Sequence, residues 1–147
     1  MRTPEQMNGD ATARRALAEH RARLAREGEN AAAAHLESRG YSILARNLRV
    51  GRNEIDILAV DPETRAVVLV EVKCRHGPAH RPEDRVDFAK RRGLSAAAER
   101  LAQRRDLRGA RFRFDVIAVE SVRAGSRGRG EPVVCHWKSA FDGMGGA

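Results

Sequence analysis

The chain has 147 residues, a length typical of a single domain that can bury a core without disulfide crosslinks. Its composition is globular, with 41% hydrophobic and 33% charged residues and a net charge of +8, and the 4% of aromatic residues requires an aliphatic core. It has no run of about 18 apolar residues, no apolar segment at its start and no cysteine framework, so we expect a soluble, cytoplasmic protein without a membrane partner.

The first predicted helix covers residues 11–38, which are rich in Ala, Arg, Glu and Leu and contain no proline. Residues 1–10 are expected to be loose, and Gly28 is expected to divide the helix in two. The first piece is rich in arginine and has only Leu17 and Leu24 as large apolar side chains. We therefore expect it to be an exposed or frayed extension.

Three strands are predicted next, over residues 41–49, 54–61 and 65–74. Short sequences of turn-forming residues separate them, which predicts antiparallel pairing. The third strand contains the most apolar run of the chain, Ala-Val-Val-Leu-Val-Glu-Val, so we expect it to lie centrally with both faces covered.

After a loop at residues 76–82, a helix is predicted over 84–105 and strands over 112–122 and 133–137. Five apolar residues are spaced for one buried face of this helix: Val86, Ala89, Ala97, Ala98 and Leu101. The element order α-β-β-β-α-β-β predicts an α/β fold with a mixed central sheet of about five strands flanked by helices.

Ionisable residues interrupt the second and third strands. Because successive side chains of a strand alternate, one face should carry Glu54, Asp56 and Leu58, and the other Ile55, Ile57 and Ala59. Glu71 and Lys73 share a face of the next strand. Pairing of the two strands should then bring Asp56 beside Glu71 and Lys73.

Two neighbouring carboxylates repel each other, and a divalent cation relieves that repulsion. Mg²⁺, or Mn²⁺ in its place, takes oxygen ligands, which Asp56, Glu71 and the carbonyl of Val72 could supply, while Lys73 would lie near the reacting water and phosphate. The pattern therefore predicts a phosphodiesterase site with Asp56, Glu71 and Lys73 as catalytic residues. The alternative is a simple ion pair between Glu71 and Lys73, since an isolated Glu-Val-Lys tripeptide is common.

An aspartate followed across a hairpin by Glu-x-Lys resembles the pattern of the PD-(D/E)xK nuclease superfamily. More closely, the chain resembles the YraN-like family, which is related to archaeal Holliday-junction resolvases. The matching stretches occur in the family's order from about residue 24 to residue 142. They are residues 28–36, 40–49, 54–59, 70–75, Lys90, 113–116 and 136–141.

The resemblance implies a restriction-endonuclease-like core and suggests cleavage of nucleic acid. It divides the chain into a basic helical extension (1–23), a nuclease-like domain (24–142) and a flexible tail (143–147). It also implies that Glu29 reaches the metal, although a glutamate near a helix start can equally well interact with the helix dipole. Asn53 replaces a glycine of the family, and because asparagine tolerates left-handed backbone, the hairpin should form.

The positive charge favours a polyanion partner, most commonly nucleic acid, and all but three of the 28 basic residues are arginine, which binds phosphate bidentately. A solvated, arginine-rich surface is the alternative reading. A zinc site at Cys74, His76 and His80 is a weaker candidate, because no fourth ligand is obvious. The residues expected to bind nucleic acid, DNA in particular, are Arg49, Arg52, Arg75, Lys90, Arg91 and Arg92.

Three functions fit this sequence. The first is a metal-dependent endonuclease acting on branched or single-stranded DNA. The second is a nuclease-fold protein that binds nucleic acid and cleaves little or not at all, and the third is a protein-interaction domain with a structural metal. The intact trio of Asp56, Glu71 and Lys73 favours the first. Paired cuts in a branched DNA need two sites, which is compatible with a homodimer.

Overall fold

The computed structural model describes residues 1–76, 88–121 and 131–140, without the side chains of residues 75, 76 and 121. Its elements, in chain order, are α1 (Pro4–Ser38), β1 (Ser42–Val50), β2 (Asn53–Val60), β3 (Val67–His76), α2 (Phe88–Ala102), η2 (Arg105–Leu107), β4 (Phe112–Ser121) and β5 (Val133–Trp137). Outside these ranges lie most of the loop at 76–82, helix residues 84–87 and the tail at 143–147.

The five strands form one mixed sheet in the order β1-β2-β3-β4-β5. The β3–β4 pair is parallel and the other three pairs are antiparallel. The predicted α/β fold and element order are thereby confirmed, and each strand begins and ends within two residues of its prediction. Among the described residues, no helix is long and apolar enough to cross a membrane.

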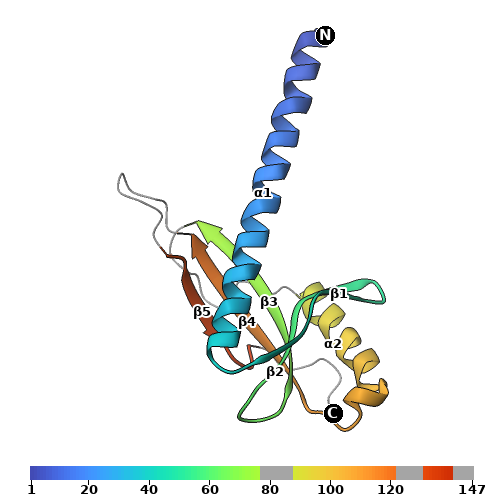
Figure 1. Cartoon of the computed structure of the whole chain (residues 1–147). Helices are drawn as coiled ribbons and strands as arrows, with labels where there is room; N and C mark the ends of the chain where they lie inside the picture. The colour runs from blue at the N-terminus through green and yellow to red at the C-terminus, as the bar shows by residue number, and fades with distance from the viewer. Residues whose placement is uncertain (77–87, 122–130, 141–147) are drawn as a thin grey trace.

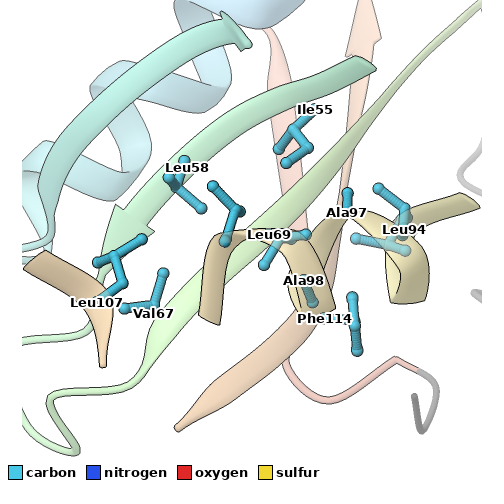
Figure 2. Packing of buried hydrophobic residues seen from close by; sticks show 11 residues of the cluster. Ile55, Leu58, Val67, Leu69, Leu94, Ala97, Ala98, Leu107 and Phe114 are labelled. Atoms are coloured by element: carbon cyan, nitrogen blue, oxygen red, sulfur yellow. The ribbon is translucent and has the colours of Figure 1, made fainter. Parts of the chain in front are cut away.

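The helices cover opposite faces of the sheet, and the N-terminal half of α1 extends well beyond it (Figure 1). β3 lies in the middle and, as expected, contributes to the core on both faces: Val68 and Val70 pack under α1, while Val67 and Leu69 pack under α2. Figure 2 shows the core on the α2 face, in which Leu94, Ala97 and Ala98 of α2 lie over the sheet.

The predictions for the N-terminal segment were wrong in two respects. Residues 4–10 are helical rather than loose, because Thr3 and Gln6 form a capping box and Pro4 occupies the first helical position. Gly28 does not divide α1, which is one helix of 35 residues. The glycine is required by packing, since a Cβ at position 28 would collide with the Sγ of Cys74 on β3.

The β1–β2 hairpin forms as expected, but by a different route from the one predicted. Val50 pairs with Asn53, and the left-handed residue of the two-residue turn is Gly51, with φ of 62°, at the position where type II′ turns place glycine. Asn53 has no positive φ. Asn53, which replaces a family glycine, therefore does not have to adopt a left-handed backbone conformation.

The predicted alternation of β2 fails at its centre. Ile55 packs with Leu58 in the α2-face core (Figure 2), whereas Ile57 belongs to the α1-face core. Between the pairs Arg46↔Ile57 and Leu48↔Ile55, the opposing strand places Asn47 in a left-handed conformation with φ of 49°. Such a residue bends and twists the pair, so the side chains change face.

On α2, the buried residues are Leu94, Ser95, Ala97, Ala98 and Leu101. Ala89, which was predicted to be buried, is exposed because the first turn of the described helix lies beyond the sheet core. Val86 lies outside the described residues.

A buried set of polar side chains, here called the polar network, joins β4 to the ends of β1, β2 and β5. It comprises Tyr41, Asp61, Arg113, Asp115 and His136. Arg113 donates two hydrogen bonds to Asp115, one to Asp61 at 2.6 Å and one to the hydroxyl of Tyr41. Asp115, which is fully buried, also lies 2.8 Å from Nε2 of His136 and accepts a hydrogen bond from the backbone N–H of Ser139.

Each carboxylate of the polar network is satisfied. Burial alone would raise the pKa of Asp61, but the hydrogen bonds from Arg113 and from the backbone N–H groups of Glu63 and Thr64 hold that pKa well below its ordinary value. Burial would likewise raise the pKa of Asp115, but hydrogen bonds involving His136 and Arg113 outweigh burial and lower that pKa. The sequence analysis missed this network.

Candidate active site

The candidate site lies where β2 and β3 part. Their ladder runs from Val60↔Val67 to Ile57↔Val70 and ends there. One further step in the same register would set Asp56 opposite Glu71. Instead, the Oδ2 atom of Asp56 accepts a hydrogen bond of 2.8 Å from the backbone N–H of Val72. A carboxylate thus takes the place of a strand partner at the point where the ladder stops.

Glu71 follows Leu69 on the α2 face of β3 and is only 5% exposed. Its Oε1 lies 3.2 Å from Nζ of Lys73, and its Oε2 lies 3.2 Å from Nζ of Lys90 on α2. Although Lys90 is within ion-pair distance, the buried Oε2 accepts no hydrogen bond from the described part of the chain. Asp56, Glu71, Lys73 and Lys90 are called the carboxylate site below.

The carboxyl group of Asp56 has a strongly shifted pKa. Burial, followed by the negative charge of Glu71, raises this pKa to about 7. The backbone N–H of Val72 and the charge of Lys90 act in the opposite direction but do not cancel the effect. Two carboxyl groups therefore lie side by side with incomplete compensation, within reach of two ammonium groups.

Lys90 was predicted to bind nucleic acid, and the structure places it beside Glu71 at the carboxylate site. Besides approaching Glu71, its Nζ donates a hydrogen bond of 3.4 Å to the backbone carbonyl of Glu54. The packing of α2 on the sheet brings it there. Sequence spacing could not reveal this pairing, because 19 positions separate Lys90 from Glu71 and the two residues lie on different elements.

Glu29 approaches the site from the other face. Burial is the main cause of a raised pKa of the Cys74 thiol, and the charges of Glu29 and Asp56 raise it further. Both carboxylates therefore lie near the same stretch of β3. Even so, no three metal-ligating side chains gather closely enough to hold a metal among the described residues. Glu29 therefore lies near Cys74 and forms no three-residue group with Asp56 and Glu71.

The same finding bears on the weaker zinc candidate. Cys74 lies on β3 beside α1, the side chain of His76 is not described, and His80 lies outside the described residues. Within those residues Cys74 belongs to no group of three metal-ligating side chains. Its thiol is instead held against Gly28.

The residues of the carboxylate site fit a hard divalent cation. Oε2 of Glu71 is a buried oxygen without a hydrogen-bond donor among the described residues, and Asp56 is a second oxygen donor beside it. The N–H of Val72 points toward β2, and because the N–H and C=O of one strand residue lie on the same edge, its carbonyl faces the same gap. Two carboxylates and a carbonyl are a usual protein share for a hydrated Mg²⁺.

The arginines predicted to bind nucleic acid lie on β1, its turn and α2. Arg49 and Arg52 are exposed on the β1–β2 hairpin, whose turn packs on α2, since a Cβ at Gly93 would meet the side chain of Asn53. On α2, Arg92 is exposed with its guanidinium over the ring of Phe88, and Arg91 is half-buried. Arg75 lies on β3, but its side chain is not described.

Comparison with known proteins connects this geometry to a family. Residues 28–119 match the uncharacterised protein family UPF0102. The matched span begins at Gly28 and contains Glu29, Asp56, Glu71, Lys73 and Lys90, so the whole candidate site lies inside it.

Several relatives align over most of their length. The UPF0102 protein CT2262 of Chlorobaculum tepidum is 38% identical over 80% of this chain and 91% of its own. A UPF0102 protein of Anaeromyxobacter dehalogenans is 43% identical over 83% and 86%, and one of Syntrophotalea carbinolica is 41% identical over 81% and 91%. Given the family match over residues 28–119 and this degree of identity, the chain belongs to the uncharacterised protein family UPF0102.

Proposed function

We propose that this protein is a metal-dependent endonuclease acting on branched or single-stranded DNA, with the carboxylate site as its active centre. The observation that carries the proposal is the incompletely compensated pair of half-buried Asp56 and buried Glu71, in which the pKa of Asp56 is raised to about 7 and Oε2 of Glu71 accepts no hydrogen bond from the described residues. Strongly perturbed carboxyl groups of this kind cluster at functional sites.

Mg²⁺ or Mn²⁺ is the proposed cofactor, held by Asp56, Glu71 and the carbonyl of Val72. When bound, a divalent cation supplies Lewis-acid polarisation of a phosphate and activation of water. The charge of Glu29 acts on the thiol of Cys74, the chain neighbour of Lys73. The proposed role of Glu29 is to act on the outer part of the metal's surroundings, since it does not form a three-carboxylate group with the other two.

Lys73 supplies the positive charge that phosphodiester hydrolysis needs. In that reaction the hydroxyl of a water molecule forms a bond to phosphorus, the bond from phosphorus to one sugar oxygen breaks, and the remaining proton of the water ends on that oxygen. Charge grows on the phosphate oxygens as this happens. The Lys73 ammonium, already 3.2 Å from Glu71, would stabilise it.

The proposed partner is DNA, which the net charge of +8 and the exposed arginines of the hairpin and α2 favour. Two cuts in a branched substrate need two active sites. A homodimer would provide them, and sedimentation at several protein concentrations tests for it.

A second candidate function is binding of nucleic acid without cleavage. One observation favours it: Glu71 has ion-pair partners in Lys73 and Lys90 without any metal, and no three metal-ligating side chains gather among the described residues. In that case the carboxylate site would hold β2, β3 and α2 together.

The deciding experiment incubates the purified full chain with labelled branched, flapped, single-stranded and duplex DNAs, with Mg²⁺, Mn²⁺ or EDTA. Parallel reactions use Asp56→Asn, Lys73→Ala and, as a matched control, Glu99→Gln, which removes an exposed charge from α2. Cleavage of at least one branched or single-stranded DNA by the wild type and the control, but not in EDTA and not by the two site variants, supports the nuclease. Binding without cleavage under every condition supports the second function.

A further inference from the structure

Residues 14–26 form a basic segment of α1 that has no partner in the described fold. Five arginines occupy these positions against a single acidic residue, Glu19. Every residue of the segment is exposed except Leu24, which is half-buried. None of the five arginines takes part in an ion pair within the described residues. The arginines are Arg14, Arg15, Arg21, Arg23 and Arg26.

The segment projects from the sheet as a continuation of the part of α1 that packs on β3 at Cys74. Figure 1 shows this half of α1 standing clear of the strands. Just beyond the segment, Gly28 packs on Cys74, and Glu29 and Asp56 both act on the Cys74 thiol. The base of the segment therefore packs against the stretch of β3 that carries the carboxylate site, from the face of the sheet opposite to Glu71.

Four of the five arginines lie on two sides of the helix. At about 100° per residue, Arg14 and Arg21 share one side of the helix, while Arg15 and Arg26 share another roughly 100° away. The segment is about 20 Å long, roughly the rise of six base pairs at 3.4 Å each. A helix lying in the major groove of a duplex has a phosphate backbone on either flank, and that groove is wide enough to admit it.

We infer that residues 14–26 are a DNA-binding arm that grips the two phosphate backbones of a duplex region beside the position that the carboxylate site acts on. This inference rests on the proposed function, because it takes the ligand of that site to be DNA. The segment precedes residue 28, where the match to the family begins. The carboxylate site, in contrast, lies inside the matched span.

The test compares two full-length variants that lose the same charge. The arm variant changes Arg14, Arg15, Arg21 and Arg26 to Gln, which preserves helix propensity. The control changes Arg65, Arg104, Arg105 and Arg108 to Gln; these exposed residues lie after β2 and around η2, at the end of the sheet where β3 and β4 begin. Circular dichroism verifies that both variants keep their helices.

The binding of a labelled DNA duplex is measured by fluorescence anisotropy over a series of KCl concentrations. Each phosphate contact contributes about 0.9 to the slope of log affinity against log salt, so the arm variant should lose roughly 3 to 4 from that slope. At low salt its affinity should fall at least about tenfold, whereas the control should change much less.

Equal losses in the two variants, or no loss in the arm variant, overturn the inference, as does a wild type that binds no duplex at low salt. A change in molecular mass of the arm variant by light scattering would also overturn it, because the segment would then be a contact between protein chains. The proposed nuclease function can fail separately from this inference. If binding depends on the arm but no metal-dependent cleavage is found, the arm is supported and the nuclease is rejected. If the arm variant binds and cleaves DNA as the wild type does, the nuclease is supported and the arm is rejected.

Discussion

The polar network and the carboxylate site each hold two carboxylates that are largely removed from solvent, yet they differ in how those charges are balanced. In the polar network, one guanidinium, a histidine and several backbone N–H groups meet Asp61 and Asp115, and the pKa of each acid is lowered. In the carboxylate site, Asp56 and Glu71 face each other, the pKa of Asp56 is raised, and one oxygen of Glu71 has no hydrogen-bond donor among the described residues.

Under the proposed function, the difference separates a structural role from a functional one. Buried polar groups are nearly always satisfied in native proteins, and the polar network follows that rule. The carboxylate site departs from it within the same sheet, only a few residues away along β3 and β4. An exception of this kind is what a binding site for a cation requires, because the ion supplies the missing charge.

The largest expected effect comes from breaking the polar network. Asp115→Asn keeps the shape but removes the charge that Arg113 meets twice, and it leaves a buried guanidinium short of a partner. The free energy of unfolding should fall by about 3–5 kcal/mol, as is typical when one member of a buried ion pair is removed. Urea unfolding measures it, and a loss below about 1 kcal/mol would mean that the network is not a determinant of stability.

Removing a charge from the carboxylate site should increase the free energy of unfolding rather than lower it. Asp56→Asn keeps an oxygen to accept the N–H of Val72 while it abolishes repulsion by Glu71. In EDTA at pH 8, the unfolding free energy should rise by about 1–3 kcal/mol. Glu54→Gln, an exposed acid on the same strand, is the control and should change stability by less than about 0.5 kcal/mol. A destabilised Asp56→Asn would contradict the comparison.

The pH dependence of stability should also differ between wild type and Asp56→Asn. The folded pKa of Asp56 is raised from 3.8 to about 7, so its favourable contribution exists below pH 4 and is lost as the pH rises toward 7. The advantage of Asp56→Asn in EDTA should therefore be near zero at pH 4, grow through pH 5 and 6, and level off above pH 7. Asp61 and Asp115, whose pKa values are lowered, contribute stability that is lost only below about pH 4 in both proteins. A constant advantage across pH would be the contrary result.

The smallest change in stability is expected for Lys73→Met. The Lys73 side chain is one third exposed, and Lys90 remains beside Glu71, so the unfolding free energy should change by no more than about 1 kcal/mol. DNA cleavage, in contrast, should fall by about 100-fold or more, because the phosphate loses its positive partner. Near-normal cleavage by a folded Lys73→Met would remove Lys73 from the proposed catalytic residues.

The sequence was sufficient to predict the elements and the meeting of Asp56 with β3. Strand periodicity and turn residues located all five strands, and the interruption of an apolar run by Glu71 drew attention to the site. The simple two-residue period nevertheless failed around Asp56, because Asn47 on the neighbouring strand adopts a left-handed conformation that bends the pair. The tolerance of asparagine for that conformation is a signal that was present in the sequence and was not used.

Long-range packing explains most of what the sequence did not predict. Gly28 looks like a helix breaker, but it is required by Cys74, a residue 46 positions away on β3. Arg113 and Asp115 alternate on β4, which hints at a shared face. Their partner Asp61 comes from a turn 52 residues before Arg113, and no local pattern encodes that contact.

Titration of the metal-free protein with Mn²⁺ by calorimetry, for wild type and Asp56→Asn at pH 8, tests most directly whether the imbalance at the carboxylate site exists to hold a cation. The account predicts saturable binding to the wild type, and at least about tenfold weaker binding to Asp56→Asn, since the variant loses one of two carboxylate ligands. Thermal melts in Mn²⁺ should accordingly stabilise the wild type more than the variant. Equal Mn²⁺ binding by the two proteins, or none by the wild type, would contradict it.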